Sequence, residues 1–117
     1  MNRAYFSIAE NKNKTDELLV RARIGGDIEK IFPNAIVKQW TGTDYRYRTS
    51  LPKKLVSKTI KKEIEKIDYS NFKDSVAPDD FQRHEAYYDV WFDLLELQKP
   101  QFPTKNFFQR FSSEKYY

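Results

Sequence analysis

Cysteine is absent from this chain of 117 residues, and histidine occurs only once, at His84. Without thiols the chain can form neither a disulfide nor a thiolate metal site, and a single imidazole cannot make a multi-histidine zinc site. Any metal ion would have to be held by carboxylates alone. We therefore expect no metal site and no cofactor.

Long apolar runs are also missing. The longest, such as those at 35–37 and 90–92, contain only a few residues, whereas a helix needs about 20 to cross a bilayer. The N-terminal segment 1–6 lacks the apolar core of a signal peptide. These absences predict a cytoplasmic protein that does not associate with a membrane.

The chain does contain enough apolar bulk to fold. Hydrophobic residues make up 39% of it and aromatic residues 16%, and each buried aromatic side chain removes roughly 150–250 Å² of surface from water. Since 117 residues is close to the commonest size of one domain, we predict a single α+β domain over residues 1–98. Residues 99–117 form an aromatic C-terminal tail that we expect to dock on the domain or on a partner.

Four segments have the composition or alternation of strands: 4–8, 18–24, 35–40 and 45–48. The second is the clearest, because its apolar and arginine positions alternate along the chain. We expect Val20 to face a core and Arg21 to face water. The pair Gly25 and Gly26 ends this strand.

Helices are predicted for most of the remainder. A short helix is expected at 28–32 with Asp27 as its cap, and a longer one near Ser50 with Pro52 in its first turn. A short helix over 72–76 and a last helix that ends near Gln98 follow, and the apolar stripe of the last helix should pack on the sheet. The predicted fold is therefore α+β, a four-stranded, largely antiparallel sheet in the order ββαββ and then helices, with helices packed on one face. The order of the strands within the sheet does not follow from the sequence.

Several short sequence motifs between residues 4 and 98 are distinctive. They include VRAR at 20–23, GTDYRYR at 42–48 and IDYSNFKD at 67–74. Through these strings the chain resembles a family of short bacterial proteins of no established function. The resemblance implies a bacterial protein, but it carries over no activity, cofactor or catalytic residue.

Arginines recur on two of the predicted strands, as Arg21 with Arg23 and as Arg46 with Arg48. If these strands are neighbours, four guanidinium groups share one sheet face. The planar guanidinium suits a phosphate or carboxylate because it donates two parallel hydrogen bonds. The pattern predicts an anion-binding site, and the net charge of +4 favours anionic partners in general.

Other interpretations of the same residues stay open. Acidic residues such as Glu17 and Asp44 could pair with the arginines, or the arginines could simply be solvated. If the anion carries a base, Trp40, Tyr45 or Tyr47 could stack on it. The lysine-rich helix face between 53 and 66 could contact phosphates, although such a face is also the ordinary covering of an amphipathic helix.

Three functions fit these patterns, and we favour the first. It is a non-enzymatic binding or regulatory module that engages an anionic partner, either a nucleotide, a nucleic acid or an acidic protein surface, through the arginine-bearing sheet face. The second is a small enzyme that acts on a phosphorylated or nucleotide substrate, with His84 or Asp44 as acid or base. The third is a protein-interaction module that uses the aromatic tail. The chain carries no recognised nucleic-acid-binding motif, and its composition does not indicate an oligomeric state.

Overall fold

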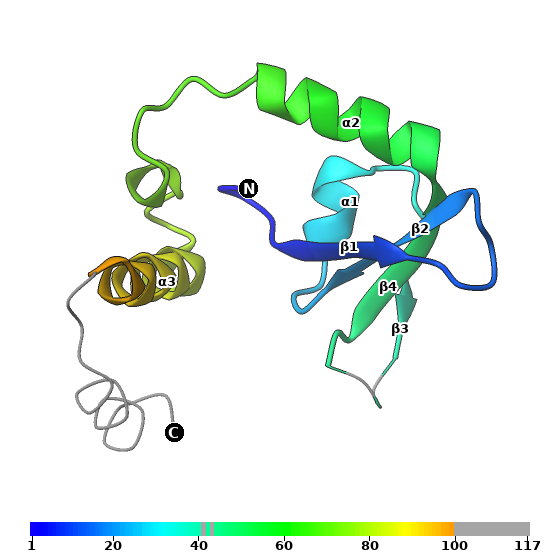
Figure 1. Ribbon diagram of the computed structural model, residues 1–117, viewed down its shortest axis with the longest axis horizontal. Coiled ribbons are helices and arrows are strands. Elements are labelled where there is room, and N and C mark those ends of the chain that lie inside the picture. Colours follow the sequence, from blue (N-terminus) through cyan, green and yellow to red (C-terminus); the bar gives the residue numbers. More distant parts are fainter. Residues whose placement is uncertain (41, 43, 100–117) are drawn as a thin grey trace. The chain divides into compact units, whose positions relative to one another are not determined.

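The computed structural model of this protein describes residues 1–40, 42 and 44–99. The chain divides into two compact units, the first comprising Met1–Ser75 and the second beginning at Val76. Figure 1 shows the elements of both units. The predicted single domain over 1–98 stays a prediction, and the predicted docking of the aromatic tail falls on residues 100–117, which lie outside the described residues.

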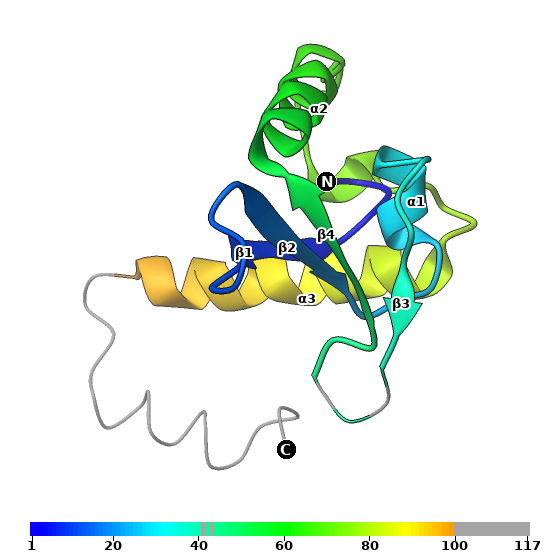
Figure 2. The same cartoon turned by 90° about the vertical axis from the view of Figure 1, so that its right-hand side faces the viewer.

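The first unit is built on a four-stranded sheet, and all of its strand pairs are antiparallel. Its strands are β1 (Phe6–Glu10), β2 (Glu17–Ala22), β3 (Lys38–Gln39) and β4 (Tyr47–Pro52). Its helices are α1 (Asp27–Ile31), α2 (Lys53–Glu65) and the single 3₁₀ turn η1 (Lys73–Ser75). The strands run across the sheet in the order β1-β2-β4-β3, as Figure 2 shows. The predicted α+β class with an antiparallel sheet is confirmed.

One face of the sheet carries the hydrophobic core. Val20, in the middle of β2, is 0% exposed, and it lies opposite Ile8 of β1 and Thr49 of β4. Ile28 of α1 and Val56 of α2 belong to the same buried cluster, so both helices cover this face (Figure 1). Burying a side chain such as Ile28 stabilises the fold by about 1.5–3 kcal/mol. The prediction that helices pack on one face of the sheet is confirmed for α1 and α2.

The boundaries of β4 differ from the prediction. The strand begins at Tyr47 instead of 45 and continues through Ser50 to Pro52, because all six of its positions pair with β2. The helix α2 therefore begins only at Lys53, and Ser50 is not its cap. The Lys53 amide donates to the Asp16 carbonyl on the β2 side, so the Pro52 nitrogen faces the other edge of β4. Proline is tolerated at such a position because no ladder hydrogen bond is lost there.

The other predicted strands are placed correctly but differ in extent. The first is displaced to Phe6–Glu10, and β2 ends at Ala22, short of position 24. The third contains only Lys38 and Gln39 instead of 35–40, because Ala35 and Val37 pack against the core instead of extending the ladder. The chain leaves β2 through Gly26, whose φ of 92° lies in the left-handed region that favours glycine.

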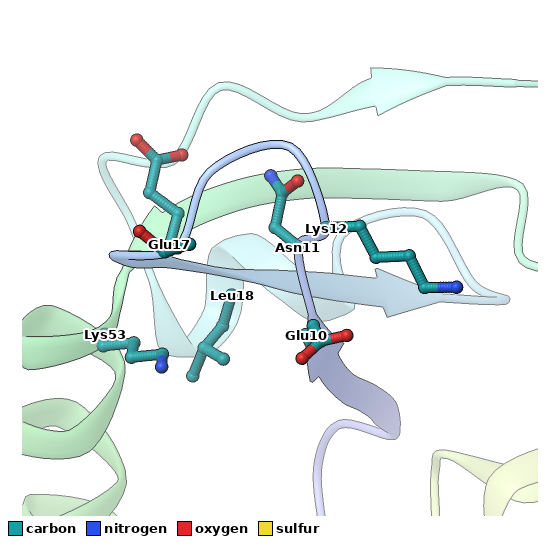
Figure 3. A pocket seen from close by; sticks show the side chains of 7 residues that line it. Glu10, Asn11, Lys12, Glu17, Leu18 and Lys53 are labelled. Carbon is teal, nitrogen blue, oxygen red and sulfur yellow. The ribbon is translucent and has the colours of Figure 1, made fainter.

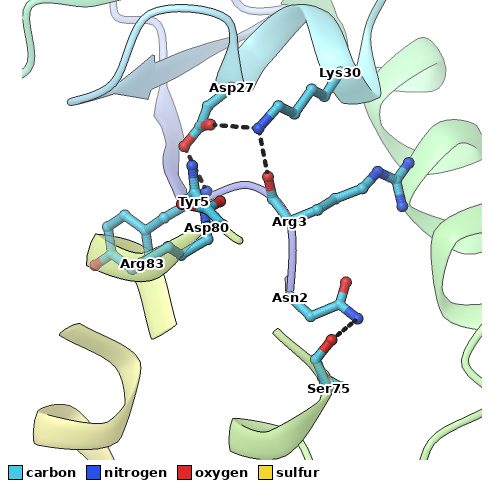
Figure 4. Close-up of polar contacts among 8 residues, drawn as sticks. All are labelled: Asn2, Arg3, Tyr5, Asp27, Lys30, Ser75, Asp80 and Arg83. Carbon is cyan, nitrogen blue, oxygen red and sulfur yellow. Dashed lines mark hydrogen bonds and ion pairs between the residues drawn. The ribbon is translucent and has the colours of Figure 1, made fainter. Parts of the chain in front are cut away.

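Asp27 does not cap α1 as predicted. Gly26 occupies the cap position, and no side chain there forms a capping hydrogen bond. The Asp27 carboxylate is buried and instead accepts a hydrogen bond from the Tyr5 backbone amide at 3.0 Å, with the Lys30 ammonium 3.5 Å from its other oxygen (Figure 4). Lys30 also donates to the Arg3 carbonyl at 3.1 Å. This buried carboxylate therefore ties the segment before β1 to the first helix.

A second polar cluster ties the N-terminal segment to the end of α2. The Glu63 carboxylate lies 2.9 Å from the Arg3 guanidinium and 3.0 Å from the Lys66 ammonium, and its side chain is only 9% exposed. Burial raises the pKa of the Glu63 carboxyl, but the hydrogen bond from Lys66 and the positive charge of Arg3 outweigh it and leave the pKa below its ordinary value. Glu63 therefore contributes to stability in its charged form.

The second unit contains the longest helix among the described residues, α3 (Phe81–Gln98). The Arg83 guanidinium donates to the Asp80 carboxylate at 2.7 Å just before the helix begins, and the rings of Tyr88 and Trp91 lie 5.8 Å apart. The expectation that this helix packs on the sheet concerns both units and stays a prediction. No helix within the described part of the chain is long and apolar enough to cross a membrane.

Candidate functional site

The face of the sheet opposite the core carries a row of positive charges. Arg21 of β2 lies directly opposite Arg48 of β4, and Lys38 of β3 lies opposite Arg48 on its other side. Ser7 of β1 completes the row across the sheet. Because side chains alternate along a strand and Val20 faces the core, these residues share the other face. Side chains directly opposite each other have Cβ atoms about 4.5–5.5 Å apart, so the three cations are close neighbours.

Two aromatic rings lie among these cations. The guanidinium carbons of Arg21 and Arg23 are 5.2 Å and 4.5 Å from the centre of the Tyr45 ring. The guanidinium carbon of Arg48 is 5.7 Å from the Trp40 ring. Tyr45 precedes β4, so the alternation of that strand does not fix the direction of its side chain. We call Arg21, Arg23, Lys38, Trp40, Tyr45 and Arg48 the arginine face.

Two arginines of this face, Arg21 and Arg23, have no carboxylate partner among the described residues. Within residues 1–40, 42 and 44–99, no carboxylate forms an ion pair with Arg21, Arg23 or Arg46. Arg21 donates to the Ser7 hydroxyl at 3.4 Å, and Arg23 donates to the Asp44 backbone carbonyl, 3.1 Å away. The alternative in which Asp44 neutralises these arginines is therefore wrong for Arg21, Arg23 and Arg46.

Glu17 is engaged elsewhere as well. Its carboxylate accepts a hydrogen bond from the Ser50 hydroxyl at 2.6 Å, and that hydroxyl in turn accepts one from the Asn11 side-chain amide at 2.8 Å. The pairing of Glu17 with Arg21, Arg23 or Arg46 that the sequence left open is not formed in the described part of the chain.

The opposed cations of the arginine face destabilise the folded protein. Like charges directly opposite each other in a sheet are destabilising, by an amount in the range of about 0.2–1 kcal/mol for cross-strand pairs. The Nε atom of Arg21 is buried and has no hydrogen-bond partner among the described residues, and such an unsatisfied donor costs about 1–3 kcal/mol. Features that break a local rule of stability are expected at functional sites.

The remaining predicted site residues lie in different surroundings. Arg46 is exposed and lies just before β4, where its carbonyl accepts a hydrogen bond from the Trp40 amide. Tyr47 packs against the core, where a side chain added at Gly25 would meet its ring at 3.1 Å. It therefore lies on the opposite face from Arg48 and is not placed to stack with Trp40.

His84 belongs to the second unit. It lines a pocket of about 420 Å³ together with Pro78, Phe81, Glu85 and Tyr88, all of the same unit. The structure therefore surrounds His84 with apolar and aromatic side chains and one carboxylate.

A groove of about 510 Å³ continues from the arginine face along the outer edge of β4. It exists because β3 pairs with β4 only at Tyr47 and Arg48, so no described strand covers the edge beyond them. Three cations, Lys14, Lys38 and Arg48, and one carboxylate, Glu17, line it. Neither Lys38 nor the groove was predicted from the sequence, because both depend on the position of β3 beside β4.

A smaller pocket of about 300 Å³ lies at the other end of the sheet. Figure 3 shows that its side chains come from the end of β1, the loop to β2, the start of β2 and the start of α2. Two of them are glutamates, Glu10 and Glu17, and two are lysines, Lys12 and Lys53. This balance of charge gives the pocket no preference for an anion or a cation, in contrast to the arginine face.

Comparisons with known proteins do not assign the chain to a family. No family model, no curated protein and no solved structure matches the chain. Among the described residues, no group of three or more histidine, aspartate or glutamate side chains lies close enough to hold a metal ion.

Proposed function

We propose that this protein is a non-enzymatic binding module that engages an anionic partner through the arginine face. The observation that carries this proposal is the row of Arg21, Arg48 and Lys38 across three adjacent strands. An anion bound across these strands would be attracted by all three cations at once. Guanidinium groups suit phosphate and carboxylate oxygens, because each can donate two parallel hydrogen bonds.

The local surroundings support the same proposal. The Tyr45 ring lies against Arg21 and Arg23, which restricts the motion of both guanidinium groups and lowers the entropy lost when an anion binds. In the described residues no carboxylate competes with an incoming anion for Arg21 or Arg23. The partner is accordingly a molecule that presents phosphates or carboxylates, such as a nucleotide, a nucleic acid or an acidic protein surface.

The two alternative functions receive less support. An enzyme would need an acid or base beside the bound anion, and because the candidate His84 belongs to the second unit, this alternative stays a prediction. Asp44 uses its backbone carbonyl, not its carboxylate, to contact Arg23. An interaction module based on the aromatic tail depends on residues 100–117, which lie outside the described residues.

A thermal-shift screen with two charge-matched variants tests the proposal. The screen covers mononucleotides, oligonucleotides and polyglutamate at low and moderate salt, and a ligand at 100 times its dissociation constant should add about 2.7 kcal/mol to the free energy of unfolding. The Arg21→Ala/Arg48→Ala variant should lose the shift. The Lys58→Ala/Lys61→Ala variant removes the same charge from the exposed surface of α2 and should keep it. Equal shifts in both variants would contradict the proposal.

A further inference from the structure

We infer that the anionic partner is a single-stranded nucleic acid, whose phosphates lie along the row of Arg21, Arg48 and Lys38 and one of whose bases stacks on Trp40. This inference rests on the proposed function, and it deepens it by naming the class of ligand. It depends on three further features of the arginine face, namely its length, its exposed indole and the groove beside it.

The row of cations is extended, whereas a single phosphate needs cations that converge on one point. Neighbouring strands lie about 4.7–4.9 Å apart, so three adjacent strands set Arg21, Arg48 and Lys38 over roughly 10 Å. Arg23 adds charge at one end of this row, beside the Tyr45 ring, and Lys14 adds charge in the groove at the other end. A backbone with repeating phosphates matches such a track better than a mononucleotide does.

Trp40 supplies the surface on which a base can stack. Trp40 is 56% exposed, and the guanidinium carbon of Arg48 lies 5.7 Å from the centre of its ring. An exposed aromatic ring beside a basic track is the combination by which proteins hold single strands without reading their sequence.

The groove beside the face gives the strand a continuation. It measures about 510 Å³, and its lining includes Lys38 and Arg48, which lie opposite each other in the register of β3 and β4. Its lining includes the apolar side chains of Leu19 and Ile36 as well as Lys14. The carboxylate of Glu17 also lines the groove, where it accepts a hydrogen bond from the Ser50 hydroxyl. A nucleotide adjacent to the stacked base can therefore place its base against apolar atoms and its phosphate near a lysine.

Fluorescence polarisation with fluorescein-labelled dT10, an unstructured single strand, tests the inference at two or more salt concentrations. Trp40→Ala should weaken binding roughly 10-fold and leave the salt dependence unchanged, because the indole carries no charge. Trp40→Phe should restore part of the affinity, since a phenyl ring still stacks. Arg21→Ala/Arg48→Ala should lower the slope of log K against log[salt] by about 1.4, which is two phosphate contacts at about 0.7 each.

The outcomes separate this inference from the proposed function. Loss of binding to dT10 and to polyglutamate alike in the arginine variant, with no effect of Trp40→Ala, would overturn the single-strand inference and leave the proposed function standing. A duplex that binds as tightly as dT10 would overturn the inference too. No difference between the arginine variant and Lys58→Ala/Lys61→Ala with any probe would overturn both.

A second measurement covers the case in which Trp40→Ala fails to fold. Trp91 is the other tryptophan of the chain, so Trp91→Phe leaves Trp40 as the sole indole emitter. Binding of unlabelled dT10 should quench the fluorescence of Trp40 in this variant, because a stacked base is in direct contact with the ring. Emission that stays constant while polarisation reports saturation would overturn the inference.

Discussion

Replacing Arg21 by methionine should stabilise the protein, although it should impair binding. Methionine keeps an unbranched, mostly apolar side chain of similar length and removes the charge. The change abolishes the repulsion of Arg48 and the buried Nε donor that lacks a partner among the described residues. It also loses the contact with the Tyr45 ring and the long hydrogen bond to Ser7.

The magnitude follows from these opposing effects. The relieved repulsion contributes about 0.2–1 kcal/mol and the removed donor about 1–3 kcal/mol. The lost cation–π contact offsets about 0.5–1 kcal/mol of this. We therefore expect Arg21→Met to raise the free energy of unfolding by about 1 kcal/mol, which corresponds to roughly 4–8 °C in Tm for a domain of 60–100 residues.

Urea unfolding at low and high salt separates the two expected contributions to the stabilisation, which are the relieved repulsion between Arg21 and Arg48 and the removal of the buried Nε donor. Arg21→Lys keeps the charge opposite Arg48 but lacks the Nε atom, so the salt-dependent part of the difference between Met and Lys at position 21 reports the repulsion. That difference should shrink between about 0.01 M and 1 M salt, where the screening length falls from about 30 Å to 3 Å. If Arg21→Met instead lowers the free energy of unfolding by 1 kcal/mol or more at low salt, the arginine is a structural residue and our reasoning is refuted.

Three further predictions concern the first unit. Asp27→Ala should lower the free energy of unfolding by about 2–3 kcal/mol, because the Tyr5 amide and Lys30 lose a buried charged acceptor; a loss below 0.5 kcal/mol in urea unfolding would speak against this role. Gly26→Ala should cost about 1–2 kcal/mol in the same assay because φ is 92°, and Gly26→Asn should cost less. The third concerns Glu63, whose pKa lies below its ordinary value of 4.5. Its stabilising effect is complete above about pH 4.5 and is lost as the pH falls through the lower folded pKa. Unfolding profiles against pH should therefore fall more steeply below about pH 4.5 in the wild type than in Glu63→Gln, and parallel profiles would contradict the assignment.

Local patterns predicted the elements well where the burial of alternate residues was strong. The alternation of Val20 and Ala22 with Arg21 identified β2 and both of its faces, because Val20 and Ala22 are both 0% exposed. The predicted start of β4 was wrong, because Tyr45 precedes the residues that pair with β2. The limits of a strand depend on the neighbouring strand with which it pairs. That neighbour is distant in the sequence, so local composition does not predict the limits.

The candidate site was only partly predictable for the same reason. The sequence showed that Arg21 and Arg48 each lie on a strand, but their pairing depends on the strand order β1-β2-β4-β3. Lys38 was missed because only the register of β3 against β4 sets it opposite Arg48. Its alternation with Trp40 along 38–40 was the available signal, since both then share the face opposite that of Gln39.

The most direct test of the arginine face as an anion-binding site is a titration of the ¹⁵N-labelled protein with dT10 or polyglutamate, followed in amide correlation spectra. We predict that the largest shifts concentrate on β2, β3 and β4 around Arg21, Lys38 and Arg48, and that they disappear in the Arg21→Ala/Arg48→Ala variant. Shifts that concentrate instead on the lysine-rich surface of α2, Lys53–Glu65, would contradict the account.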